Sequence, residues 1–314
     1  MPREKKPLDL RPSVEILESA DEESEESVVL LEAPESKSKS TPEKGGKFTI
    51  EDFEIGRLLG NGAYGYVFLA RTKTGHFLCA IKVLPKSEIL EREDEYLLAR
   101  EIEIQSHLHH PNVVRLYTYF WDETNVYLVM EYAPGGELYK AQDRVYRFPE
   151  YLAAKYIFEI ADALEYCHGK HVIHRDIKPE NLLLGVDGEV KIADFGLSVH
   201  APSNKRTTRC GTMDYQSPEL LSHLPYGTSV DIWTIGVLLF EFLVGCPPFE
   251  RDTEEDTHEA IKSVDYTFPI GISEGAKDLI SRLLRREPVE RLTLREVKKH
   301  YWIEEMKKKR ERMV

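Results

Sequence analysis

Apolar and polar residues follow two different periods along the chain. From Phe53 to Leu84 the apolar positions suit strands joined by tight turns, with "KTGH" as one of the turns. Residues 94–108, "DEYLLAREIEIQSHL", instead have apolar side chains at helical spacing, and two strand-like runs follow, "VVRLYTYF" and "NVYLVMEY". The pattern therefore predicts a small, strand-rich lobe that contains one helix.

After "APGGE" the pattern becomes mainly helical. Residues 151–170, "YLAAKYIFEIADALEYCHGK", predict a long amphipathic helix that ends near Gly169. The most apolar run, "IWTIGVLLF" at 232–240, is too short to span a bilayer and predicts a buried helix. Together these elements predict an α+β, bilobal fold, in which a strand-rich small lobe precedes a mainly helical large lobe.

The two ends of the chain differ from the lobes in composition. Residues 1–46 are rich in Glu, Ser, Lys and Pro, and "ESADEESEES" has almost nothing to bury, so this arm is predicted to be disordered. The island "VVLLEAP" (Val28–Pro34) is either a docking segment or a transient collapse. We expect the small lobe at 47–133, the large lobe at 134–304 and a basic tail at 305–314 that extends the last helix, with a solvated basic face.

Composition narrows the class of protein. The chain has 314 residues, of which 41% are hydrophobic and 31% charged, as is ordinary for a globular protein. Its net charge of −13 disfavours nucleic acid as a partner, including sequence-specific binding, and favours acidic clefts for basic peptides. No apolar leader begins the chain, and no direct membrane contact is expected. The cysteines are scattered and are predicted to be free thiols: Cys79, Cys167, Cys210 and Cys246.

A glycine-rich stretch, "GNGAYGYV" at Gly60–Val67, matches G-x-G-x-x-G-x-V. The same glycine spacing marks dinucleotide folds, but there a helix opens at the glycines. Here "YVFLARTKTGHFLCAIKVL" continues as a hairpin, whose glycine tip lets backbone N–H groups approach a phosphate closely. The alternative is a merely flexible turn.

The strand "CAIKVL" places Lys82 among apolar residues, where an unpaired ammonium is unfavourable. Glu101, on the following predicted helix, is the candidate partner, and a phosphate group is the other. If Lys82 instead lay at a surface strand end and pointed outward, it would need neither.

The most specific stretch is "HRDIKPEN" at His174–Asn181, followed by "DFG" at Asp194–Gly196. This ordered pair of motifs is typical of protein kinases, which bind ATP and Mg²⁺. Asp176 is predicted to accept the proton of a substrate hydroxyl, and Lys178 to steady the transferring phosphate. Asn181 and Asp194 are predicted to ligate Mg²⁺. Three further residues are predicted to be structural: Glu219 in "SPE" should pair with Arg291, and Asp231 should cap the catalytic-loop backbone.

These motifs, with "GGKFTIEDFEIGRLLG", "REIEIQSHLHHPN" and "DFGLSVHAPSNKRTTRCGT", resemble the Aurora serine/threonine kinases over about residues 46–304. "APGGELYK" resembles the B type, for which Glu137 is a marker, and "TPEKGGKFTI" and "RTKTGHF" resemble nematode members. The resemblance implies a mitotic kinase that acts in chromosome segregation and cytokinesis. It also implies binding to the inner centromere protein, survivin and borealin, and phosphorylation of histone H3. The implied locations are the nucleus, chromosome and centromere, the spindle midzone and midbody, and the cytoskeleton.

The resemblance also implies which residues contact the nucleotide. They come from the glycine-rich hairpin, the Lys82 strand, the segment between the lobes and the two catalytic motifs: Gly60, Asn61, Gly62, Ala63, Gly65, Val67, Ala80, Lys82, Glu131, Ala133, Glu180, Asn181, Leu183 and Asp194. The group expected to perform or support the transfer is Lys82, Glu101, Asp176 and Lys178.

"NKRTTRCGT" (204–212) lies between DFG and SPE and corresponds to the activation loop, where the resemblance makes Thr208 the activating phosphosite. Phosphorylation adds about −1.5 to −2 charges, and Arg100, Arg175 and Arg206 are expected to converge on them. Glu137 and Glu180 are expected to meet Arg or Lys upstream of a target hydroxyl. The loop itself carries "KR" before Thr208, so we expect one copy to phosphorylate another.

Gln105 stands one helical turn after Glu101, facing inward, where most kinases have an apolar residue. A polar group there weakens the active helix position unless it is hydrogen-bonded, and a water-filled pocket behind the helix is expected to accommodate it. The sequence departs from the family at Leu197, Arg209, Gln216 and Ser217. Arg209 and Gln216 predict a weaker apolar preference after the target hydroxyl.

Three alternatives remain in view. A pseudokinase scaffold would lack Lys82, Asp176 or Asp194, and all are present. A kinase of the cAMP-dependent type would carry an F-x-x-F tail, which does not follow the large lobe. A tyrosine kinase is disfavoured because Lys178 and Thr212 occupy serine/threonine-type positions.

Overall fold

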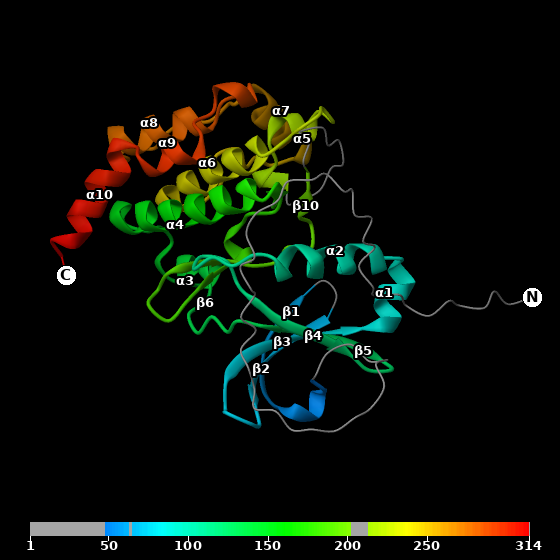
Figure 1. Ribbon diagram of the computed structural model, residues 1–314. Helices are drawn as coiled ribbons and strands as arrows, with labels where there is room; N and C mark the ends of the chain where they lie inside the picture. The colour runs from blue at the N-terminus through cyan, green and yellow to red at the C-terminus, as the bar shows by residue number, and fades with distance from the viewer. Residues whose placement is uncertain (1–47, 63–64, 202–212, 314) are drawn as a thin grey trace, which may run out of the picture.

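The computed structural model describes residues 48–62, 65–201 and 213–313 (Figure 1). The arm 1–46, with its "VVLLEAP" island, and the activation-loop residues Arg206, Thr208 and Arg209 lie outside the described residues, as do Ala63 and Cys210. Cys79, Cys167 and Cys246 are free thiols, as predicted. None of the described helices is both long enough and apolar enough to cross a membrane.

The small lobe is an antiparallel five-stranded sheet with helices on one side, as Figure 1 shows. The strand order is β1-β2-β3-β5-β4. The elements are β1 Phe53–Gly62, β2 Gly65–Thr72, β3 Leu78–Pro85, α1 Lys86–Arg92, α2 Glu95–Ser106, β4 Leu116–Trp121 and β5 Asn125–Met130, preceded by a 3-10 turn at Ile50–Asp52. The predicted strands and the helix at 94–108 are confirmed. Helix α1 was not predicted, because its seven residues are too few to show a helical period.

The large lobe is mainly helical, as predicted, and its core gathers around α4 and α6. Helix α4 covers Glu150–Gly169 and ends where the sequence predicted. Helix α6, Ser229–Val244, is buried along almost its whole length, which fits its apolar run. The other helices are α3 Leu138–Val145, α5 Pro218–Leu221, α7 Glu254–Ser263, α8 Glu274–Leu283, α9 Leu294–Lys298 and α10 Tyr301–Glu311, and α10 carries the basic tail.

Short strands and 3-10 turns lie between the large-lobe helices and after the small lobe, and several of them carry the predicted site residues. They are β6 Gly136–Glu137, β7 Val172–Ile173, β8 Leu182–Leu184, β9 Val190–Ile192 and β10 Val199–His200, with 3-10 turns at Pro179–Asn181, Met213–Tyr215 and Pro288–Glu290. Strand β8 pairs with both β6 and β9, so the segment after the small lobe lies against the strand pair that precedes the DFG motif. Figure 1 shows α2 on the side of the sheet that faces the large lobe.

Candidate active site

Strand β3 and helix α2 bring Lys82 and Glu101 together, as the sequence predicted. The Lys82 Nζ lies 2.9 Å from Glu101 Oε1, and both side chains are largely buried. The β-sheet register places Lys82 between Val67 of β2 and Leu128 of β5, in the middle of the sheet. The pair thus ties α2 to the sheet and holds an ammonium in a site from which most water is excluded.

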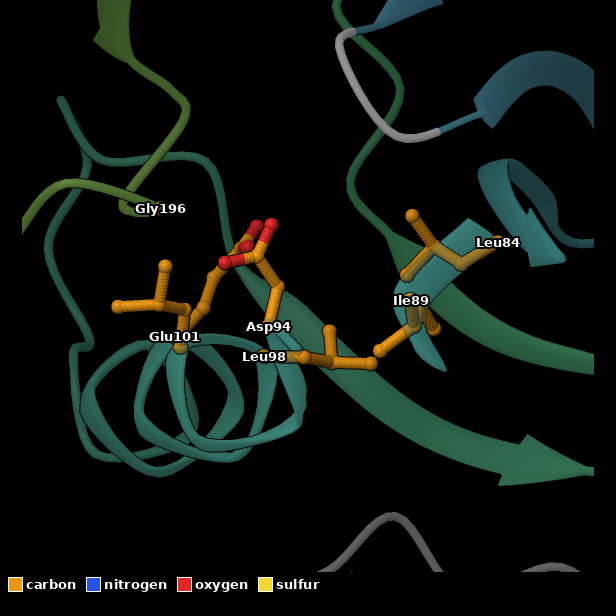
Figure 2. A pocket seen from close by; sticks show the side chains of 7 residues that line it. Leu84, Ile89, Asp94, Leu98, Glu101 and Gly196 are labelled. Carbon is orange, nitrogen blue, oxygen red and sulfur yellow. The ribbon is translucent and has the colours of Figure 1, made fainter. Parts of the chain in front are cut away.

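A small cavity beside α2 is lined by Glu101 of this pair and by Gly196 of the DFG motif (Figure 2). Leu84, Ile89 and Leu98 form its apolar wall, and Glu101 points toward Gly196 at its other end. A Cβ at Gly196 would lie 3.4 Å from Glu101 Oε2 and 3.2 Å from Asp194 Oδ1. Glycine at this position therefore lets the two carboxylate-bearing segments approach one another closely.

Asp231, at the start of α6, organises the backbone of the catalytic loop. Its carboxylate accepts hydrogen bonds from the His174 N–H at 3.0 Å and from the Arg175 N–H at 2.9 Å, and it contacts His168 Nε2 at 2.8 Å. Burial acts to raise the pKa of Asp231, but these hydrogen bonds outweigh it and hold the pKa below its ordinary value. Arg175 has a φ of 72°, an unfavourable conformation for a non-glycine residue. The predicted capping role of Asp231 is confirmed, and it fixes this strained turn.

Asp176 lies next to two other residues of its motif. Asn181 Nδ2 donates to Asp176 Oδ2 at 2.9 Å and to the Asp176 carbonyl at 2.8 Å. Lys178 Nζ lies 3.1 Å from Asp176 Oδ2. Asp176 is therefore largely buried and has a fixed orientation, in which its carboxylate can accept a proton from a hydroxyl that binds next to it.

The candidate metal ligands fit a hard cation such as Mg²⁺, which prefers oxygen donors. The Asn181 amide uses its nitrogen for Asp176, so its carbonyl oxygen is the group suited to a metal. Asp194 also has a left-handed backbone, with φ at 60°, and its Oδ1 accepts from the Gly196 N–H at 3.3 Å. The Ala193 N–H donates to the Asn181 carbonyl at 2.9 Å, which links the two ligand-bearing segments.

The predicted nucleotide-contacting residues lie on elements that border the space between the lobes. Gly60, Asn61 and Gly62 end β1, and Gly65 begins β2 with a φ of 147°. A Cβ at Gly65 would lie 2.0 Å from the Val83 carbonyl, so only glycine fits there. Val67 lies on β2, Ala80 on β3 and Leu183 on β8, and Ala133 follows β5; the two alanines are buried.

Glu131, in the segment after β5, uses its carboxylate for structure. Oε1 lies 2.8 Å from Lys191 Nζ, and Oε2 accepts from the Arg115 N–H at 3.2 Å. Its backbone, rather than its carboxylate, is therefore the part suited to a nucleotide.

Comparison with known proteins agrees with this geometry. The family model described as "Protein kinase domain" matches residues 53–303. "Aurora/IPL1-related protein kinase 2" of Caenorhabditis elegans is 60% identical over 277 residues, which are 88% of this chain and 91% of that protein. Aurora kinase C of Mus musculus is 57% identical over 258 residues, 82% of this chain and 94% of that protein. The chain belongs to the Aurora family of protein serine/threonine kinases.

Two acidic residues, Glu137 and Glu180, were expected to meet basic residues of a substrate. Glu137, on β6, lies opposite Leu183 of β8 and pairs with Lys140 at 2.8 Å. A Cβ at Gly60 would lie 3.9 Å from its Oε1, so Glu137 is close to the glycine-rich hairpin. Glu180 is exposed on the 3-10 turn that also carries Asn181.

Sequence analysis missed a third acidic residue, Glu241, which lies in α6 and is 8% exposed. Tyr215 donates its hydroxyl to Glu241 Oε2 at 2.5 Å. Burial raises the pKa of Glu241 to about 7, against the hydrogen bond from Tyr215, which lowers it. The nearby charges of Glu180, Asp214 and Glu250 add to the rise. A carboxylate within the apolar run "TIGVLLFEFLV" was the signal that could have identified it.

Two arginines of the expected phosphate-binding group, Arg100 and Arg175, lie within the described residues. Arg175 donates from Nε to the Leu197 carbonyl at 2.7 Å and from a guanidinium nitrogen to the Tyr226 hydroxyl at 2.8 Å. The Arg100 guanidinium lies 5.5 Å from the centre of the Tyr96 ring. Because Arg206 and Thr208 lie outside the described residues, convergence on a phosphate stays a prediction.

Gln105 is 2% exposed and donates its Nε2 to the Val114 carbonyl at 3.0 Å. The amide nitrogen of Gln105 is therefore bound by a backbone carbonyl and not by water in the expected pocket. This hydrogen bond ties α2 to the segment before β4.

The departures Gln216 and Ser217 are both buried, and the Ser217 hydroxyl has no hydrogen-bond partner among the described residues. Next to them, Glu219 and Arg291 form the predicted ion pair, with two contacts of 2.6 and 2.7 Å.

Proposed function

We propose that this Aurora kinase phosphorylates serine and threonine residues that are preceded by arginine or lysine. The observation that carries the proposal is the group of carboxylates around Tyr215, in which Glu180 lies on the same turn as Asn181. A basic side chain bound there would bring a hydroxyl a few residues further along its chain toward Asp176. Glu137, on the hairpin side, is suited to a second basic residue.

The transfer would follow from positioning and charge, because phosphoryl transfer needs little covalent help from the protein. Asp176 would orient the hydroxyl and accept its proton. Lys82, held by Glu101, and Lys178 would offset the negative charge on the phosphate oxygens. Mg²⁺, held by Asn181 and Asp194, would supply further charge neutralisation when bound.

We infer that activation requires both phosphorylation of Thr208 and a partner on the small lobe. Exposed ion pairs contribute about 0–1 kcal/mol each, and charge-assisted hydrogen bonds about 1.5–3 kcal/mol. Moving a population from 1:99 to 99:1 requires about 5.5 kcal/mol. Contacts from Arg100, Arg175 and Arg206 that are partly exposed lie between these two ranges, so together they would fall near or below that value. We therefore expect phosphorylation alone to activate incompletely and a bound partner to supply the remainder.

Family resemblance supports the cellular part of the proposal. Glu137 is the marker for a B-type kinase, and the inner centromere protein is the proposed small-lobe partner, with survivin and borealin in the same complex. Histone H3 is the proposed substrate, on chromosomes and centromeres and later at the spindle midzone and midbody, in chromosome segregation and cytokinesis.

The first experiment is phosphosite mapping after incubation with Mg·ATP. We expect phosphate to accumulate on Thr208 in the wild-type protein, faster at higher protein concentration because one copy modifies another. Asp194→Asn is the control and should incorporate none. No incorporation by wild-type protein, even with an added inner centromere protein fragment, would contradict the proposed activity.

A second prediction concerns pH. Because the pKa of Glu241 is about 7, the carboxylate becomes negatively charged as the pH rises through that value. The ionised fraction increases from roughly 10% at pH 6 to roughly 90% at pH 8, so KM for a peptide with one arginine a few residues before the hydroxyl should fall up to about tenfold. The same shift means that the free protein loses stability as the pH rises from the ordinary value of 4.5 toward 7.

The matched controls are Glu241→Gln and a peptide with alanine in place of that arginine. Each should remove most of the change in KM between pH 6 and 8. An equally steep change with the alanine peptide would show that Glu241 does not bind the arginine.

A further inference from the structure

A second cavity lies on the opposite side of α2 from the cavity in Figure 2. Its volume is about 520 Å³, and it separates α2 from the strand pair β7 and β10. Ile104, Leu108, Val172 and Val199 form a buried apolar floor. Arg100, Lys170, His107 and His200 lie around this floor, and Tyr96, which is 73% exposed, stands at the rim. We call this cavity the α2 hollow.

The α2 hollow is basic although the whole protein has a net charge of −13. Its lining contains two permanent cations, Arg100 and Lys170, and one carboxylate, Glu103. The Lys170 ammonium lies 5.5 Å from the centre of the Tyr166 ring, and the Glu165 carboxylate, five residues earlier, pairs with Lys298. An anionic segment with aliphatic side chains would match both the cations and the apolar floor.

The chain itself contains such a segment. Residues 22–31, "EESEESVVLL", place four glutamates and two serines before four aliphatic residues. The connection from Ser27 to Phe48 has 21 residues, with a root-mean-square span of about 25 Å and a maximum of about 70 Å. Helix α2 belongs to the lobe that this connection enters at Phe48. We propose that residues 22–31 bind in the α2 hollow of the same molecule.

Binding there would make the arm a regulatory element. This consequence rests on the proposed function, in which Arg100 pairs with the phosphate on Thr208. The arm and the phosphate would compete for Arg100, so the arm would occupy the α2 hollow in the unphosphorylated kinase and leave it on activation.

The test is carbodiimide coupling, which joins a carboxylate directly to a lysine amine that it touches, in the dephosphorylated full chain without ATP. Peptide mapping should find Lys170 joined to a glutamate of residues 22–26. Lys73 is the matched reference, because it is exposed and its N–H bonds to the Asp52 carbonyl, close to where the arm joins the lobe. A mixture of ¹⁴N- and ¹⁵N-labelled protein distinguishes links within one chain from links between chains.

We expect Lys170 links to exceed Lys73 links, to be within one chain, and to fall at about 1 M salt, where the screening length is about 3 Å. Arg100→Gln should lower the Lys170 links about fivefold and leave the Lys73 links unchanged. Links mainly at Lys73, or mainly between chains, would overturn the proposal. Because the coupling needs no catalysis, its failure is independent of the kinase activity; loss of the links after Mg·ATP treatment tests the competition separately.

Discussion

Replacing Asp176 with asparagine should lower kcat about 10²- to 10⁴-fold while leaving the fold intact. The asparagine has nearly the same shape and retains an oxygen that can accept from Asn181 and Lys178, which both contact the native carboxylate. It cannot accept the proton of a substrate hydroxyl at neutral pH. Initial rates with a basic peptide at saturating ATP measure the loss, and a thermal melt checks the fold.

Asp187→Asn is the control for this variant. This substitution makes the same chemical change, from a carboxylate to an amide, on an exposed turn between β8 and β9, away from Asp176. It should keep kcat within about twofold of wild type, because surface substitutions away from special features have small effects. If Asp176→Asn also kept kcat within about tenfold, Asp176 would not be the proton acceptor and the roles in the catalytic loop would need to be reassigned.

The sequence was sufficient where short motifs identified both partners of a long-range contact. Lys82 and Glu101 are 19 residues apart and Glu219 and Arg291 are 72 apart, yet each pair was predicted before its geometry was known. Composition and periodicity do not reveal such pairs, whereas the motifs identify both partners. The strands and long helices were predictable for a different reason, since their apolar periods persist over several turns or strand residues.

The sequence was insufficient where one member of a contact carries no signature. Gln105 bonds to a backbone carbonyl, and any residue at position 114 would offer the same acceptor. Glu241 appeared to be part of an apolar helix, and only the fold shows that Tyr215 and three other carboxylates surround it. The α2 hollow is also invisible in the sequence, because residues from α2, β7 and β10 meet there only after folding.

Replacing Arg291 with methionine should lower the free energy of unfolding by about 3–5 kcal/mol. The Arg291 side chain is fully buried, donates to both oxygens of Glu219, and lies 5.1 Å from the centre of the Trp233 ring. Methionine fills similar space but leaves the Glu219 carboxylate buried without its partner. Urea unfolding measures the loss.

Arg282→Met is the matched control, because Arg282 forms an exposed pair with Asp278 in which its own side chain is 52% exposed. It should lower the free energy of unfolding by less than about 1 kcal/mol. If Arg291→Met and Arg282→Met lowered the free energy of unfolding equally, the buried pair of Glu219 and Arg291 would contribute no more to stability than an exposed pair.

The double variant Glu219→Leu with Arg291→Met separates the two sources of the loss. Removing both charges relieves the uncompensated carboxylate, and a buried ion pair replaced by apolar residues is often neutral in stability. Recovery here should stay partial, because Arg291 also donates to the carbonyls of Ser229, Arg285 and Arg286, which the double variant leaves without these bonds. The pair joins α5, at the end of the activation segment, to the segment before α9. The double variant should therefore lose most of its kinase activity even though its free energy of unfolding partly recovers. The chain would keep its core but lose the anchor for the substrate-binding loop.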